Sequence, residues 1–176
     1  MECVRVHEGG FLQNKQGRFN YSSIIGKKYG AKIHSQNGER FLFVLRFTPE
    51  LWSLVLPHRT QIIYHADISF ILAQLSVLPG ASVIESGTGS GSFSHSLSRA
   101  IGPAGKLYTY EFHEERALKA QDEFKLHGIQ NISILHSDVC ENGFGLYDSV
   151  DAVFLDLPAP WKAIQHAKQS MKVVCC

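Results

Sequence analysis

A glycine-rich turn between a predicted strand and a predicted helix constrains this chain more than any other feature. Residues 81–92 read Ala-Ser-Val-Ile-Glu-Ser-Gly-Thr-Gly-Ser-Gly-Ser. The β-branched Val83 and Ile84 favour a buried strand, because branched side chains fit a pleated surface well. Three alternating glycines follow, which are Gly87, Gly89 and Gly91. Glycine adopts positive φ angles easily and has no Cβ, so a ligand can approach this backbone closely.

The residues after the turn predict a helix over residues 92–101. Phe93, Leu97 and Ile101 are spaced four residues apart and therefore share one face of such a helix. The glycine turn then lies at the helix N-terminus, where the first backbone N–H groups have no partner within the helix. A strand, a glycine turn and a helix in this order are typical of nucleotide-binding sites.

The spacing of the glycines indicates which kind of nucleotide is bound. Dinucleotide-binding turns read G-x-G-x-x-G and hold a pyrophosphate at the helix N-terminus. Here the spacing is G-x-G-x-G, and Glu85 precedes it. A carboxylate there repels a pyrophosphate but attracts the ammonium or sulfonium group of S-adenosylmethionine. We therefore favour S-adenosylmethionine over a nicotinamide cofactor, and a glycine-rich loop with a solvated Glu85 stays the simpler alternative.

Composition indicates a globular chain. Of the 176 residues, 44% are apolar and 19% are charged, which excludes a disordered chain. No apolar run reaches the roughly 18 residues of a membrane helix, and the N-terminus shows no signal peptide. The sequence therefore predicts no membrane partner.

The four cysteines show no pattern that is typical of a metal site. They are Cys3, Cys140, Cys175 and Cys176, and no two form a C-x-x-C pair. We therefore predict neither a metal site nor a disulfide framework, and a reducing compartment is the simpler interpretation. The terminal pair would suit prenylation, but no polybasic tract precedes it, so we interpret it as an abrupt chain end.

Charge is distributed unevenly along the chain. Residues 1–65 contain nine lysines and arginines against four acidic residues, whereas residues 66–176 contain eight against twelve. The N-terminal part therefore carries a net charge of +5 and the remainder a net charge of −4. A basic N-terminal module suits a partner with phosphate groups, and an ordinary solvated surface is an equally good interpretation.

Residues 1–56 are predicted to form a small antiparallel β domain. Short runs of strand-forming residues alternate there with turn residues. The runs comprise residues 4–6, 20–25, 32–33 and 41–45. Residues 41–45 are almost entirely apolar, so we expect the last strand to be covered on both sides. Pro49 is expected in a tight turn or at the first position of a helix.

Residues 57–65 are interpreted as a linker that contributes to the active site, and residues 66–176 as a second domain. Helix and strand patterns alternate in this second domain. Helices are expected at residues 66–75, 92–101 and 114–127, and strands at 81–85, 106–110, 132–135 and 151–155. Alternation at this spacing implies a parallel sheet with helices on both faces.

An acidic residue occurs at or just after the end of each predicted strand of the second domain. These residues are Glu85, Glu111, Asp138 and Asp156. Ligands of an open α/β sheet bind beyond the carboxyl ends of the strands, so we expect the four carboxylates to converge on one crevice. Glu111 follows the glycine turn by about 20 residues, a position from which a carboxylate can bind two ribose hydroxyls. A single such acid is more often a cap or turn residue, but four in succession favour a site.

Four segments of the sequence together resemble one enzyme family, the catalytic subunits of the eukaryotic tRNA adenine-58 N1-methyltransferases. They are Glu-Ser-Gly-Thr-Gly-Ser-Gly-Ser at 85–92, Tyr-Glu-Phe-His at 110–113, Phe-Leu-Asp-Leu-Pro-Ala-Pro-Trp at 154–161 and His-Arg-Thr-Gln-Ile-Ile-Tyr at 58–64. The glycine segment alone marks class I methyltransferases, whereas Arg-Thr-Gln-Ile-Ile-Tyr with Asp-x-Pro-x-Pro-Trp is specific to this family. The resemblance covers about residues 24–172. It implies an α/β fold, with a Rossmann-like class I methyltransferase sheet after the small β domain.

The resemblance implies S-adenosylmethionine as the cofactor. The glycines and Ser90 to Ser92 would hold its methionine part, Glu111 its ribose and Asp138 its adenine, while Arg116 supports the site. The cofactor-binding residues are then Glu85, Gly87, Gly89, Ser90, Gly91, Ser92, Glu111, Arg116, Asp138 and Asp156.

The resemblance also implies methyl transfer to N1 of adenine 58 in the T-loop of tRNA. Asp156 and Tyr64 would be the catalytic residues, and Gln61 and Tyr64 would line the pocket for the target adenine. N1 lies on the base-pairing edge, so the adenine must leave its stack before it can react. Asp156 can accept a hydrogen bond from the exocyclic amino group, and Tyr64 or His65 can stack on the ring. A half-buried packing role is an equally good interpretation of Tyr64.

Partners and location are implied in the same way. Members of the family act with a non-catalytic companion subunit in a nuclear heterotetramer that binds tRNA. The sequence holds about four of the seven strands of a class I sheet, and we expect the C-terminal strands and the family's first N-terminal strands to be missing. The alternative function is that of a truncated form with weak or no activity, which binds the companion subunit.

Overall fold

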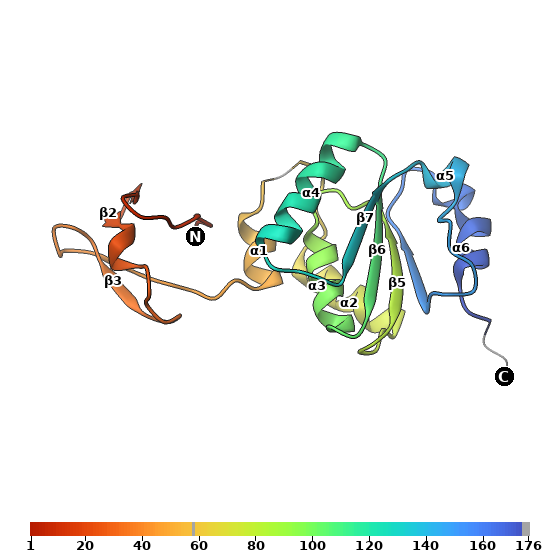
Figure 1. Ribbon diagram of the computed structural model, residues 1–176, viewed down its shortest axis with the longest axis horizontal. Coiled ribbons are helices and arrows are strands. Elements are labelled where there is room, and N and C mark those ends of the chain that lie inside the picture. Colours follow the sequence, from red (N-terminus) through yellow and green to blue (C-terminus); the bar gives the residue numbers. More distant parts are fainter. Residues whose placement is uncertain (58, 174–176) are drawn as a thin grey trace. The chain divides into compact units, whose positions relative to one another are not determined.

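The computed structural model describes residues 1–57 and 59–173, which divide into two compact units (Figure 1). The first unit comprises Met1–Val55, and the second begins at Leu56. Each unit buries apolar side chains of its own. His58 and the Cys175-Cys176 pair, which the sequence interpretation includes, lie outside the described residues.

The first unit contains two antiparallel strand pairs and one short α-helix, as the prediction of a small antiparallel β domain requires. Its elements are β1 (Phe11–Asn14), β2 (Gly17–Asn20), the 3₁₀ turn η1 (Tyr21–Ser23), β3 (Lys32–His34), β4 (Phe41–Phe43) and α1 (Pro49–Val55). Strand β1 pairs with β2, and β3 pairs with β4. Pro49 is the first residue of α1, where a missing N–H costs no hydrogen bond. Phe19, Ile33 and Trp52 are buried in this unit.

Two of the predicted strand-forming runs are wrong. Residues 4–6 belong to no strand, and Tyr21–Ser23 forms the 3₁₀ turn η1 instead of a strand. The carbonyl of Tyr21 accepts hydrogen bonds from the N–H groups of both Ile24 and Ile25, at 2.9 and 2.8 Å. These local bonds bend the chain directly after β2, so residues with high strand propensity have no ladder partner.

The expectation that the strand at residues 41–45 is covered on both sides is also wrong. Phe41 and Phe43 are 46% and 55% exposed. Phe43 pairs with Lys32 across the strand pair, and the Lys32 Nζ lies 3.9 Å from the centre of the Phe41 ring. This face of the β3–β4 pair therefore stays open, and the opposite face carries the buried Ile33.

The second unit is built around a four-stranded parallel sheet. Its strands are β5 (Ser82–Ser86), β6 (Lys106–Glu111), β7 (Ile132–His136) and β8 (Ala152–Leu155), in the spatial order β7-β6-β5-β8. The chain moves from β5 outward to β7 and then returns to the other side of β5 with β8. The strand order reverses at β5, and open α/β sheets bind ligands beyond the carboxyl ends of the strands at such a point.

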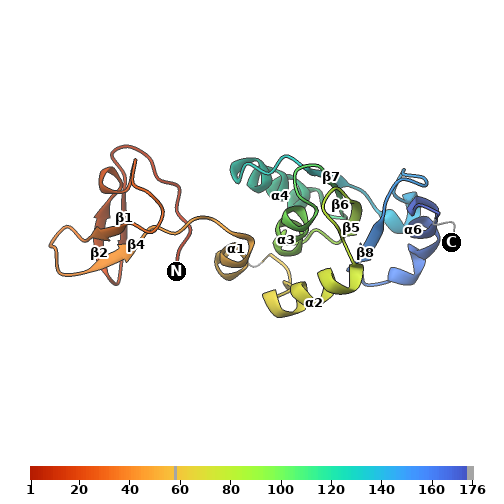
Figure 2. The same ribbon diagram turned by 90° about the horizontal axis from the view of Figure 1, so that it is seen from below.

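Helices cover both faces of this sheet (Figures 1 and 2). They are α2 (His65–Leu75), α3 (Ser92–Ile101) and α4 (Glu114–Leu126) on one face, and α5 (Val139–Asn142) and α6 (Ile164–Ser170) on the other. Val83 packs in one core with Phe93 of α3, whereas its neighbour Ile84 packs in a second core with Val139 of α5. Adjacent strand residues point to opposite faces, so a strand covered on both sides is apolar throughout.

The predicted parallel sheet with helices on both faces is confirmed. Every helix and strand predicted between residues 66 and 155 lies within one residue of an observed element at each end. Helices α5 and α6 and the 3₁₀ turn η2 (Pro160–Lys162) were not predicted, because elements of one or two turns show little periodicity. Among the described residues, no helix combines the length and apolar character that a membrane crossing requires.

Candidate active site

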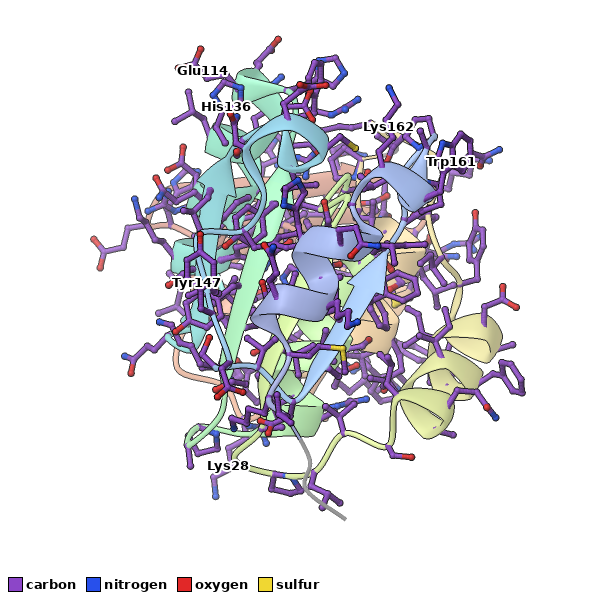
Figure 3. All side chains as sticks on the ribbon, turned by 90° about the vertical axis from the view of Figure 1, so that its right-hand side faces the viewer. Lys28, Glu114, His136, Tyr147, Trp161 and Lys162 are labelled. Atoms are coloured by element: carbon purple, nitrogen blue, oxygen red, sulfur yellow. The ribbon has the colours of Figure 1, made fainter. Side chains whose placement is uncertain are left out.

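A cavity of about 660 Å³ opens at the carboxyl ends of the four parallel strands. The predicted convergence of carboxylates is observed, since one from each strand end lines this cavity. They are Glu85, Glu111, Asp138 and Asp156. The segment Thr60–Ile63, which precedes α2, lines it as well. Figure 3 shows Lys162 and His136 at this same end of the sheet.

The glycine turn is conformationally specific at two positions that line the cavity. Gly87 and Gly89 have φ angles of 99° and 55°, in the region that side chains disfavour. A Cβ on Gly87 would collide with the backbone carbonyl oxygen of Asp156. A Cβ on Gly89 would lie 2.7 Å from the Oγ1 of Thr60. The turn is therefore held between the end of β8 and the segment before α2, and only glycine fits there.

Glu111 is held as a charged carboxylate at the end of β6. It is 3% exposed, and its Oε1 accepts hydrogen bonds from the His113 N–H at 3.0 Å and from Arg116 at 2.7 and 3.0 Å. Its Oε2 accepts from the Gly89 N–H at 2.9 Å. Burial alone would raise the pKa of Glu111, but these hydrogen bonds and the Arg116 charge hold that pKa below its ordinary value. With one donor only, Oε2 can still accept from a ligand hydroxyl.

Glu85 is in a contrasting environment at the end of β5. It is 1% exposed, and its Oε2 accepts a hydrogen bond from the Ser94 Oγ at 2.6 Å. Burial raises the pKa of Glu85 to about 7, and the neighbouring carboxylates of Asp156 and Glu111 add to the rise. A cationic ligand would stabilise the charged form of this group, so the surroundings of Glu85 favour a ligand that carries a positive charge.

The two aspartates come from the loops after β7 and β8. Asp138 is the N-cap residue of α5, where its Oδ1 accepts from the Cys140 N–H at 2.9 Å. The Asp156 N–H donates to the carbonyl of Ser86 at 2.8 Å, which fixes the end of β8 beside the end of β5. Both residues line the cavity, so the loops after β7 and β8 each contribute a carboxylate to it.

A buried histidine, His95, contacts the glycine turn at Gly91, outside the described cavity lining. The His95 Nδ1 donates to the carbonyl oxygen of Gly91 at 2.6 Å, because a carbonyl can only accept. Its Nε2 lies 2.9 Å from the Nδ1 of His127 and therefore accepts from that ring. Burial lowers the pKa of His95 to about 4, so this ring is neutral at pH 7.

A comparison with known families decides what kind of chain this is. The profile of the family described as tRNA methyltransferase complex GCD14 subunit matches residues 40–176. The chain belongs to the GCD14 family. A relative from Cryptococcus neoformans var. neoformans serotype D, named tRNA (adenine(58)-N(1))-methyltransferase catalytic subunit TRM61, is 48% identical over 182 residues. That match covers 100% of this chain and 42% of the relative, so the chain spans less than half of the relative's length.

Two solved structures share the fold of this GCD14 family member. A SAM-dependent O-methyltransferase from Thermotoga maritima matches with a TM-score of 0.83 and 32% identity, over 96% of this chain and 63% of that one. The tRNA (m1A58) methyltransferase TrmI from Aquifex aeolicus matches with a TM-score of 0.78 and 29% identity, over 96% of this chain and 65% of that one. The predicted Rossmann-like methyltransferase fold is thereby confirmed.

Most of the site residues predicted for this GCD14 family member line the cavity, and two do not. Besides the four carboxylates, the lining contains Gln61, Gly87, Gly89, Ser90, Ser92 and Arg116. Gly91 lies behind the turn, where a Cβ would be 3.3 Å from the ring of Phe124. Tyr64 precedes α2 and is 49% exposed, outside the described cavity wall. The roles of all these residues stay predictions.

Sequence reasoning missed several polar residues of the cavity. Thr60, His113 and Lys162 line it, and none was assigned a role, although Thr60 and His113 belong to segments that carry the family resemblance. His113 lies just beyond the end of β6 at Glu111, and this position could have predicted that it lines the cavity. Lys162 follows the Pro-Ala-Pro-Trp segment and is brought back to the cavity by the 3₁₀ turn η2, which the sequence pattern did not reveal.

Proposed function

We propose that this chain binds S-adenosylmethionine in the 660 Å³ cavity and belongs to the catalytic part of a tRNA adenine-58 N1-methyltransferase. The observation that carries the proposal is the convergence of Glu85, Glu111, Asp138 and Asp156 around one glycine turn. An anionic cofactor such as a dinucleotide would meet repulsion from these groups, whereas a ligand with an ammonium and a sulfonium group suits them. The names of the relatives support the same reaction.

The residues present fit the cofactor. Glu111 can accept hydrogen bonds from ribose hydroxyls, and the turn at Gly87 and Gly89 leaves room for close approach to the backbone. We assign the adenine end to Asp138, since the loop after β7 lines the same cavity. Glu85 is assigned to the charge of the methionine part, because a positive neighbour removes the cost of ionising it.

The cofactor supplies an electrophilic methyl group, and the chain's own residues orient the adenine. We propose that Asp156 accepts a hydrogen bond from the exocyclic amino group of the base and offsets the positive charge that develops on the methylated ring. Gln61 lines the cavity and is assigned to the same base. The adenine has to be extruded from its stack to reach them. Tyr64 follows the cavity-lining Ile63, and its exposed ring is assigned to stacking at the entrance.

The further assignments concern the whole protein. We propose tRNA and a non-catalytic companion subunit as partners and the nucleus as the location. The family description names a methyltransferase complex, and the relatives are named catalytic subunits, which supports a companion. The net charge of +5 over residues 1–65 suits contact with phosphate groups.

Titration calorimetry with S-adenosylhomocysteine tests the cofactor assignment. We expect the wild-type chain to bind, and Asp156→Ala to bind about tenfold more weakly, because it removes one wall of the cavity. Glu115→Gln is the matched control, since Glu115 is an exposed acid of α4 that pairs with Lys119 and lies outside the cavity lining. A folded wild-type chain that binds no S-adenosylhomocysteine contradicts the proposal.

Methyl transfer to tRNA separates the two possible functions of this chain. The chain is mixed with companion subunit, labelled S-adenosylmethionine and tRNA transcripts that carry adenine or guanine at position 58. Transfer to the adenine transcript alone supports the enzyme. Co-purification with the companion subunit without any transfer favours a chain that binds the companion subunit without catalysing the reaction.

A further inference from the structure

A single arginine fastens the segment that forms one wall of the cavity. Arg59 donates from its two terminal nitrogens to Oε1 and Oε2 of Glu123, at 2.7 and 2.8 Å. The two side chains are only 14% and 18% exposed. A bidentate arginine–carboxylate pair that is shielded from water is stronger and geometrically stricter than a surface pair. This pair joins residues that are 64 positions apart in the sequence.

The same arginine also contacts the glycine turn. The Arg59 N–H donates to the Oγ of Ser90 at 3.2 Å, and its guanidinium donates to the carbonyl oxygen of Ser90 at 3.4 Å. The Thr60 Oγ1 lies 3.4 Å from the Ser90 Oγ, and at the other end the Ser92 Oγ donates to the carbonyl of Ile63 at 3.1 Å. Residues 59–63, here named the strap, are therefore attached at both ends to the turn.

Helix α4 holds the strap and the proposed ribose-binding carboxylate, Glu111, from one face. Arg116, which donates to Glu111, lies seven residues before Glu123, and residues seven apart share a helix face. The pair Glu115–Lys119 lies on the exposed surface of the same helix. One rigid element thus fixes both the carboxylate at the end of β6 and the strap.

We infer that Arg59 is a positioning residue: its pairing with Glu123 holds the strap, and with it Gln61, against the glycine turn in the binding geometry. The inference rests on the proposed function, because it takes the cavity as the cofactor site. A strap that is ordered before binding loses little conformational freedom when a ligand arrives. A strap without its anchor has to be ordered by the ligand, and affinity falls.

The test combines hydrogen exchange with ligand binding on the full 176-residue chain. In Glu123→Gln, we expect the backbone amide of Arg59, the strap N–H that donates to the Ser90 Oγ, to exchange at least tenfold faster, while amides of β5 and β6 keep their protection. The dissociation constant for S-adenosylhomocysteine should rise five- to tenfold. Arg59→Lys keeps the positive charge but loses the second hydrogen bond, and we expect smaller changes in the same direction. Glu115→Gln should change neither readout.

The outcomes are distinguishable. Faster exchange confined to the strap together with weaker binding supports the inference. If exchange increases uniformly over the second unit, or if strap exchange and affinity equal those of the wild type, Arg59 is a structural residue only and the inference is wrong. If Glu123→Gln does not fold, Arg59→Lys gives the same two readouts. A wild-type chain that binds no S-adenosylhomocysteine contradicts the proposed function, whereas the exchange result tests the anchor separately.

Discussion

Two neighbouring strand ends of this molecule each carry a buried glutamate, and the pKa values of these two glutamates are shifted in opposite directions. At the end of β6, Glu111 receives hydrogen bonds from Gly89, His113 and Arg116, which hold its pKa below the ordinary value. In β5, next to it in the sheet, Glu85 is also buried, and burial outweighs the hydrogen bonds from Ser94 and Thr109 and raises its pKa to about 7.

The difference shows that the protein's own groups stabilise the ionised form of one carboxylate in this site and leave the ionised form of the other destabilised by burial. The charge of Glu111 is compensated by the protein itself, so this carboxylate is preorganised and needs no ligand to stay ionised. The charge of Glu85 is compensated only in part, by hydrogen bonds from Ser94 and Thr109, so ionising it costs stability near neutral pH, and a bound cation would offset that cost. The following predictions test this contrast.

The largest loss of ligand affinity is expected when the carboxylate of Glu111 is removed. Glu111→Ala leaves the Gly89 N–H and the Arg116 guanidinium without their buried partner and deletes the acceptor for the ribose. We expect S-adenosylhomocysteine to bind about 100-fold more weakly, which corresponds to about 3 kcal/mol. Titration calorimetry measures the affinity, and a thermal melt measures the stability. If Glu111→Ala binds S-adenosylhomocysteine as tightly as the wild type, Glu111 is not a ligand-binding carboxylate and the contrast with Glu85 is wrong.

Replacement of Glu85 is expected to increase stability instead. The pKa of Glu85 rises on folding from an ordinary 4.5 to about 7, so the native state binds more protons and the unfolding free energy falls as pH increases through this range. Glu85→Gln removes this loss while its amide oxygen can still accept from Ser94. We expect the unfolding free energy of the variant, relative to that of the wild type, to rise by about 3 kcal/mol as the pH increases from 4.5 to 8.

The pH experiment compares denaturant unfolding of Glu85→Gln and wild type at each pH. The wild-type curve alone is ambiguous, because His95 acts in the other direction. Its pKa falls on folding from 6.5 to about 4, so its contribution is present above pH 6.5 and is lost as pH falls through 4. His95 is present in both proteins, and the difference between them isolates Glu85. A difference that does not change with pH contradicts the raised pKa.

A smaller effect is expected on the choice between two ligands. S-adenosylmethionine carries a sulfonium charge that S-adenosylhomocysteine lacks. If the sulfonium group of the ligand compensates the charge of Glu85, Glu85→Gln should weaken binding of S-adenosylmethionine about tenfold more than binding of S-adenosylhomocysteine. Equal losses for both ligands, measured by competition, would assign Glu85 to the methionine ammonium or to structure alone.

The smallest effect is expected at the third strand end. Asp138→Ala removes the N-cap bond to the Cys140 N–H, which costs about 1 kcal/mol of stability, and it deletes one polar wall at the proposed adenine end. We expect S-adenosylhomocysteine to bind about fivefold more weakly. Asp138→Asn, which can still cap the helix, should keep the stability and lose only affinity, and a variant that loses neither would remove Asp138 from the site.

The sequence predicted the second unit better than the first. Alternating apolar strands and amphipathic helices leave a regular pattern, so the ends of β5 and α3 were predicted within one residue. In the first unit, strands of three or four residues leave almost no period, and the coverage of Phe41 was misjudged because register decides which face packs.

The candidate site divides in the same way. The carboxylates Glu85 and Glu111 could be predicted, because topology brings the carboxyl ends of parallel strands together. The pair Arg59–Glu123 and the bond from His95 to Gly91 could not, since they join segments whose approach depends on the packing of side chains. Tyr64 was placed at the cavity by its motif, and the motif does not specify where the chain turns before α2.

The most direct measurement of the central claim is a crystal structure of this chain with sinefungin, an analogue of S-adenosylmethionine that carries an amine in place of the methylated sulfur. We expect the ribose hydroxyls within hydrogen-bond distance of Glu111 and the analogue's amine facing the carboxylates of Glu85 and Asp156. Sinefungin bound elsewhere, or oriented with its cationic groups away from these carboxylates, would contradict the account.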